Sequence, residues 1–152
     1  MQYSEGTLGR VFVIRLEHGE AMPQVLEELA AARGVRSGIA IMVGGLDDGG
    51  RIVVGPEDGA ALPAVPVVRA LRGVHEVVAV GTLIPDAQGK PMLHMHAACG
   101  RGEETETGCI RAGVAAWHVL EIVLIEINGL DAARLPDAAT GFHLLQCMGK
   151  RE

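Results

Sequence analysis

The segment at residues 91–99, Pro-Met-Leu-His-Met-His-Ala-Ala-Cys, constrains the fold of this chain more than any other stretch. Side chains of an extended strand alternate between its two faces, so His94 and His96 point to one face and their apolar neighbours to the other. A glycine-rich charged segment follows, and then a second extended stretch at 106–112. This order predicts an antiparallel β-hairpin that carries two imidazoles on one side.

The register of this hairpin decides which residues lie beside the histidines. Symmetrical closure around a four-residue loop at 101–104 pairs residue 96 with 109 and residue 94 with 111. Directly opposed residues have Cβ atoms about 4.5–5.5 Å apart, so Cys109 would come close to both imidazoles. A slip of one residue would turn Cys109 to the other face. In the symmetrical register, His94, His96 and Cys109 can meet at one metal ion.

These three ligand types are typical of a catalytic zinc site. Zinc accepts nitrogen and thiolate ligands at about 2.0–2.3 Å, and three protein ligands leave one tetrahedral position for water or a substrate. We therefore predict zinc at His94, His96 and Cys109, and another transition metal is compatible with the same ligands. The alternative is that the histidines are ordinary polar residues on an exposed strand face.

Arg111 faces the histidines in this register and is the candidate catalytic residue. Its guanidinium can hold the carboxylate or phosphate of a small substrate through two parallel hydrogen bonds. With equal weight, it can be a solvated arginine that pairs with Glu104 or Glu106. Cys99 has the opposite parity and Cys147 lies in a terminal apolar stretch, so we expect both in the core.

The remaining sequence predicts a single α+β domain at residues 10–149, after a loose lead-in at 1–9. Apolar residues recur at helical spacing after Pro23, which indicates one amphipathic helix that ends at Gly34 and leaves Glu27 and Glu28 solvated. Short apolar runs elsewhere indicate about seven or eight strands in a mainly antiparallel, curved sheet. We also expect a glycine-rich hairpin turn at 44–50, a loop at 56–66 and a helical turn at 131–134. The expected strands are 10–16, 37–43, 51–55, 74–84, 91–99, 106–112, 117–127 and 142–148.

Composition argues against two classes of partner. The formal net charge is −6 and only 3% of the residues are aromatic, whereas nucleic-acid-binding domains usually carry a basic patch. The longest apolar run, 114–127, contains charged residues and is shorter than the roughly 20 residues of a membrane span. Three cysteines and no leader-like segment indicate a cytoplasmic protein. We expect the basic pair Lys150 and Arg151 to form a solvated tail.

Several motifs in this order resemble the PPC (plant and prokaryote conserved) domain family. The strongest is Gly-Lys-Pro-Met-Leu-His-Met-His at 89–96, followed by Thr-Gly-Cys at 107–109. Weaker matches are the run 10–20, the stretch Gly-Val-Arg-Ser-Gly at 34–38, the Gly-Gly turn at 44–45 and the segment 75–82. The resemblance implies a strongly bent, largely antiparallel sheet, a homotrimer, and a fold similar to zinc-dependent acetolactate decarboxylase.

This sequence departs from the commonest family pattern at two places, Gly108-Cys109 and Glu76-Val-Val-Ala79, the second of which is Glu-x-x-Ser in many relatives. Many members have Gly-Gly-His where this chain has Gly108-Cys109, so the third ligand would be a thiolate instead of an imidazole. Plant members carry AT-hook segments that grip DNA, and no Arg-Gly-Arg-Pro hook occurs here. We therefore do not transfer the DNA-binding role of the plant relatives.

The leading hypothesis is a homotrimeric PPC-type protein that binds zinc and a small anionic ligand or substrate. If it is an enzyme, we expect metal-dependent lyase or hydrolase chemistry on a small oxo-acid. Two alternatives stay open: a non-catalytic trimeric interaction module, and a DNA-associated regulator as the plant relatives suggest.

Overall fold

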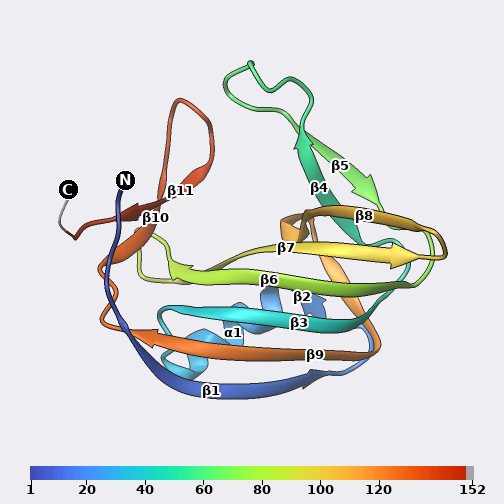
Figure 1. Ribbon diagram of the computed structural model, residues 1–152, viewed down its shortest axis with the longest axis horizontal. Helices are drawn as coiled ribbons and strands as arrows, with labels where there is room; N and C mark the ends of the chain where they lie inside the picture. The colour runs from blue at the N-terminus through green and yellow to red at the C-terminus, as the bar shows by residue number, and fades with distance from the viewer. Residues whose placement is uncertain (150–152) are drawn as a thin grey trace.

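A nine-stranded sheet forms most of this computed structural model, which describes residues 1–149; the Lys150–Arg151 pair lies outside this range. The spatial order is β1-β9-β3-β6-β7-β8-β4-β5, β2 pairs with β9, and all the pairings within the sheet are antiparallel (Figure 1). A separate two-stranded hairpin, β10–β11, follows the sheet. The elements are β1 (Thr7–Leu16), β2 (Ala21–Met22), α1 (Gln24–Arg33), β3 (Gly38–Leu46), β4 (Arg51–Pro56), β5 (Pro66–Ala70), β6 (His75–Pro85), β7 (Pro91–Arg101), β8 (Glu104–Cys109), the 3-10 helix η1 (Ile110–Ala112), β9 (Val114–Asn128), β10 (Ala132–Pro136) and β11 (His143–Cys147).

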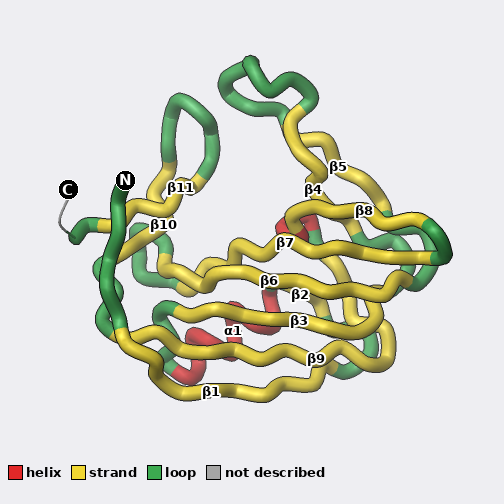
Figure 2. Tube along the Cα trace, in the orientation of Figure 1, coloured by secondary structure: helices red, strands yellow, loops and turns green. Residues whose placement is uncertain are grey.

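One face of the sheet is buried against helix α1. Leu26 and Ala30 of the helix belong to one apolar cluster with Met42 of β3, Met95 of β7 and Leu124 of β9. Pro23 is the N-cap of the helix, and the left-handed Gly34, with φ of +66°, ends it as predicted. Figure 2 shows α1, in red, behind strands β3 and β9.

The opposite face carries apolar residues that remain exposed. Val13 of β1 is 83% exposed, Ile41 of β3 is 42% exposed and Val80 of β6 is 54% exposed. The pairings place these residues in one row across the sheet, and the row continues to His96 of β7. The histidine face is therefore continuous with an exposed apolar face.

The β7–β8 hairpin has the predicted register from its turn to the pair His96 and Cys109. His96 pairs with Cys109, and the ladder runs back to Arg101 and Glu104, so the turn is tighter than the expected four-residue loop. Strand β8 ends at Cys109, where η1 begins. The expected pairing of residue 94 with Arg111 is therefore wrong, because the chain has left the sheet by that position.

Other parts of the sequence prediction need correction. The sheet has nine strands instead of seven or eight, since β2 and β5 were not foreseen. Strand β1 begins at Thr7, inside the expected lead-in. Residues 44–50 do not form a hairpin turn, because β3 pairs with β6 and β9 whereas β4 pairs with β5 and β8. The helical turn expected at 131–134 is strand β10.

Within residues 1–149, no helix is both long enough and apolar enough to cross a membrane.

Candidate metal centre

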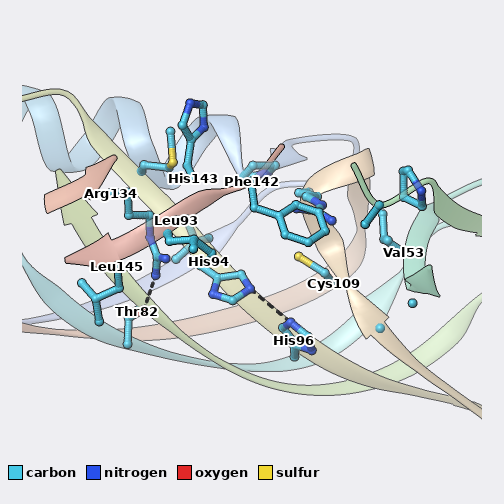
Figure 3. A pocket seen from close by; sticks show the side chains of 18 of the residues that line it. Val53, Thr82, Leu93, His94, His96, Cys109, Arg134, Phe142, His143 and Leu145 are labelled. Atoms are coloured by element: carbon cyan, nitrogen blue, oxygen red, sulfur yellow. Dashed lines mark hydrogen bonds between the residues drawn. The ribbon is translucent and has the colours of Figure 1, made fainter. Parts of the chain in front are cut away.

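Three side chains on β7 and at the end of β8 bring nitrogen and sulfur donors together. The Nε2 atoms of His94 and His96 are 3.2 Å apart. One donor atom from each of His94, His96 and Cys109 lies within 4.8 Å of the other two. Both imidazoles are exposed, whereas Cys109 is 4% exposed. Figure 3 shows the three side chains pointing toward a common space beside β7, where they could hold a metal ion.

A glycine beside Cys109 allows this arrangement. A Cβ atom on Gly108 would lie 2.6 Å from the carbonyl oxygen of Val53 in β4. Strands β4 and β8 touch through the pair Val53 and Cys109, so this close approach fixes the position of the cysteine. In the Thr-Gly-Cys motif, the glycine thus allows β4 and β8 to approach closely, and the next residue supplies the thiol.

The early end of β8 leaves part of β7 without a strand partner on that side. The backbone N–H of Leu93 donates a hydrogen bond to Glu27 Oε1 of helix α1 at 2.8 Å, in place of a strand. Glu27 was expected to be solvated, but it is partly buried and lines a cavity beside the histidines. This carboxylate was not recognisable from the helical pattern, because its partner is a strand edge 66 residues away.

The cavity beside the three donors has a volume of about 780 Å³. Strands β4 and β5 form one side, and the β10–β11 hairpin and the residues before β11 form another. Its walls are largely apolar, with Val53, Leu93, Phe142 and Leu145 among them (Figure 3). A volume of this size is within the roughly 300–1,000 Å³ of small-molecule pockets.

Arg111 also lines this cavity, although it does not pair with His94 in the sheet. Its guanidinium carbon lies 5.3 Å from the centre of the Phe142 ring, in a cation–π contact. Among the described residues, it forms no salt bridge with Glu104 or Glu106. Arg111 is exposed and lies at the edge of the cavity, so it can reach both solvent and a ligand.

A second arginine, Arg134 of β10, was missed because its segment was expected to be a helical turn. It lines the same cavity, is 5% exposed and donates from Nη2 to Thr82 Oγ1 at 2.8 Å. Thr82 pairs with His94, so the guanidinium lies over the histidine face. The sequence offers little signal for this placement, because it depends on how a distant hairpin packs.

The surroundings of His94 disfavour its protonated form. Burial lowers the pKa of His94, and the positive charges of Arg134, His96 and Arg111 lower this pKa further. A neutral imidazole is the form that can bind a metal ion. Burial also lowers the pKa of the Arg134 guanidinium from its usual value.

The other cysteines do not join the cluster. Cys99 is fully buried in the core on the opposite face of the sheet, as expected, and burial raises the pKa of its thiol to about 11. Cys147 of β11 is partly buried and does not line the cavity, so its expected place in the core is only partly met.

Comparison with solved structures shows the same fold in proteins of low sequence identity. A metal-containing protein from Archaeoglobus fulgidus has a TM-score of 0.81 at 22% identity, with 96% of this chain and 99% of that chain covered. A plant- and prokaryote-conserved (PPC) protein from Pyrococcus horikoshii has a TM-score of 0.79 at 23% identity, with the same coverage of 96% and 99%. A candidate DNA-binding protein from Ralstonia eutropha has a TM-score of 0.70 at 19% identity, with 88% and 89% covered.

The sequence itself identifies the family. None of the curated proteins matches it. It does match the Plants and Prokaryotes Conserved domain, and the match spans residues 3–128, from before β1 to the end of β9. The β10–β11 hairpin follows the matched region. It supplies Arg134 of β10 and residues 143–145 of β11 to the cavity. The chain therefore belongs to the Plants and Prokaryotes Conserved (PCC) domain family.

Proposed function

We propose that this PCC-domain protein binds zinc through His94, His96 and Cys109 and leaves one coordination position open to a small anionic ligand. The observation that carries the proposal is the cluster of three donor atoms within 4.8 Å of one another at the edge of a cavity. Two imidazoles and a thiolate are a ligand set that zinc accepts. The Archaeoglobus fulgidus relative, which is described as metal-containing, supports the same conclusion.

The surroundings of the cluster favour an anionic ligand. A bound zinc ion would act as a Lewis acid toward an oxygen atom of that ligand. Arg111 lines the cavity without a carboxylate partner among the described residues, so its charge is available to a ligand.

Elemental analysis tests the metal site directly. The protein is purified without added metal, and its metal content is measured beside that of the variants His94→Ala and Cys109→Ser. We expect about one equivalent of zinc in the wild-type chain, and at least a tenfold loss of zinc affinity in each variant, because each removes one of three ligands.

Matched controls separate the loss of a ligand from a general loss of structure. His118→Ala and Cys147→Ser remove the same side-chain types outside the cavity, and they should keep the wild-type zinc content. Full zinc retention by both His94→Ala and Cys109→Ser would refute the site.

We also propose that the chain forms a homotrimer through the exposed apolar face of the sheet. Val13, Ile41 and Val80 form part of this face, and contiguous exposed apolar surface of this kind is typical of an interface. Light scattering should give a mass of about three times 15.9 kDa. Ile41→Glu should dissociate the oligomer, whereas Leu62→Glu, an exposed apolar residue in the loop before β5, should not. A wild-type chain that stays monomeric at millimolar concentration would contradict this proposal.

A DNA-associated role is the second candidate, since the Ralstonia eutropha relative of the same fold is described as a candidate DNA-binding protein. The net charge of −6 argues against strong binding to phosphates. Fluorescence anisotropy with duplex DNA at low salt decides between the two. Salt-sensitive binding would support the regulator, and no binding at low salt would remove it. A trimer that binds neither zinc nor DNA would instead indicate a non-catalytic interaction module.

A further inference from the structure

We propose that Arg134 is the anion-binding residue of the cavity and that its ligand is an organic carboxylate with an apolar substituent. The inference rests on the proposed function only in placing a metal ion beside this ligand. Arg134 lies in β10, beyond the matched PCC region, so it is a feature of this chain's C-terminal hairpin.

The guanidinium of Arg134 is buried without a counter-charge. It is 5% exposed, and its hydrogen-bond partner is the neutral hydroxyl of Thr82, at 2.8 Å. Among residues 1–149, no acceptor lies within hydrogen-bond reach of its Nε, and no carboxylate forms a salt bridge with it. A buried charge that lacks a partner destabilises the fold, so a structural role alone does not account for this side chain.

The other acidic groups at the cavity do not pair with Arg134. Cys109 lines the cavity, and in the proposed metal site its sulfur would be a zinc ligand. Glu27 also lines the cavity, but its Oε1 accepts the Leu93 N–H, and it forms no salt bridge with Arg134 in the described chain.

The charged side chains around the cavity then favour an anion. Arg111 and Arg134 contribute two positive charges, against one negative charge from Glu27. A carboxylate that reaches the guanidinium edge of Arg134 supplies both a counter-charge and hydrogen-bond acceptors. Because Thr82 holds one Nη2–H, the plane of the guanidinium is already oriented over the histidine face (Figure 3).

The walls indicate what else the ligand carries. Beyond the charged groups, the cavity is lined by Val53 and Pro66 on one side and by Phe142, Leu144 and Leu145 on the other. These apolar surfaces can pack an alkyl or aryl group, but they offer few partners to a second charged or hydroxylated end. We therefore assign the ligand to carboxylates that carry a branched-chain or aromatic substituent, and not to inorganic anions.

Isothermal titration calorimetry with 4-methylpentanoate tests this assignment in metal-free and in zinc-loaded protein. We expect wild-type protein to bind the probe in both forms, and Arg134→Met to weaken binding at least tenfold in both, about 1.4 kcal/mol. Arg134→Lys should recover part of the affinity because it restores the charge but not the planar fork. Arg69→Met, which removes an exposed arginine outside the cavity, should bind like the wild type.

Thermal unfolding without ligand gives a second readout that a structural role would not produce. Replacing an unpaired buried charge by an apolar side chain should leave the melting temperature of Arg134→Met unchanged or higher. A drop of several degrees would indicate a structural arginine and overturn the proposal.

The remaining outcomes also decide the question. Equal affinity of wild type and Arg134→Met overturns the role of Arg134. Binding of inorganic phosphate or of uncharged 4-methylpentan-1-ol in preference to the carboxylate, or no binding of the carboxylate, overturns the ligand class. Failure of the proposed zinc site would appear in the elemental analysis. It would not affect the titration of metal-free protein, so the two proposals can fail separately.

Discussion

Replacing Gly108 with alanine should damage both the stability of the protein and the proposed metal site. The added Cβ would lie 2.6 Å from the Val53 carbonyl oxygen and 3.0 Å from the Val53 carbonyl carbon, both of them backbone atoms. Ordinary contact begins at 3.4 Å, so β4 and β8 must separate by about 0.8 Å. Overpacking of this kind costs about 1–3 kcal/mol of the free energy of unfolding.

The same displacement acts on Cys109, the next residue and the partner of Val53. Metal–ligand distances tolerate deviations of only about 0.2 Å, so we expect Gly108→Ala to bind zinc at least tenfold more weakly. Gly100→Ala is the matched control, because it lies on the same hairpin and its Cβ would meet no atom closer than 3.7 Å. Its stability should be unchanged or slightly higher, since alanine restricts the unfolded chain.

Urea denaturation of metal-free protein measures the stability of these variants, and competition with a chelating dye measures their zinc affinity. The expected order is wild type and Gly100→Ala together, with Gly108→Ala clearly lower in both assays. If Gly108→Ala were as stable as Gly100→Ala and bound zinc as tightly, the packing account of the Thr-Gly-Cys motif would be refuted.

Three further predictions concern single contacts. Hydrogen bonds from Arg10 lower the pKa of Glu126 to about 2. This carboxylate should therefore stabilise the fold above about pH 4.3 and lose that effect as the pH falls toward 2. In metal-free protein, Glu126→Gln should weaken the fall in stability at acid pH, and an unchanged fall would contradict this. Glu27→Ala should lower the free energy of unfolding by about 1–3 kcal/mol, because it leaves the Leu93 N–H unpaired. Glu27→Gln keeps an acceptor for this N–H and should cost clearly less. Equal losses in the two variants would exclude this hydrogen bond as the cause. Cys99 should resist alkylation in folded protein at pH 8, since it is fully buried and its thiol pKa is about 11, and rapid labelling detected by mass spectrometry would show that its strand opens readily.

The alternation of side chains along one strand was enough to predict the central hairpin. It placed His94 and His96 on one face and Cys99 on the other, and the charged glycine-rich turn led to the pairing of His96 with Cys109. Parity and turn position are local properties, so one sequence can specify them.

The expected place of Arg111 opposite His94 was wrong because a strand's end depends on its surroundings. The chain turns into η1 at Ile110, and Gly113 follows with φ of +100°. The glycine is visible in the sequence, but nothing nearby shows that β8 stops before it. Arg111 still reaches the cavity, from the 3-10 helix instead of the strand.

Arg134 and Glu27 could not have been found by periodicity. Their roles depend on packing between segments far apart in the chain: Arg134 meets Thr82 across 52 residues, and Glu27 meets Leu93 across 66. A short alternating segment such as 132–136 is also too weak a signal to distinguish a strand from a helical turn.

The central claim is that one metal ion is held by two imidazoles and one thiolate. X-ray absorption spectroscopy at the zinc edge, on protein purified without added metal, tests it most directly. The account predicts one sulfur ligand at about 2.3 Å and two imidazole nitrogens at about 2.0–2.1 Å, with the sulfur signal lost in Cys109→Ser. Protein that holds no zinc, or zinc whose spectrum contains no sulfur ligand, would contradict it.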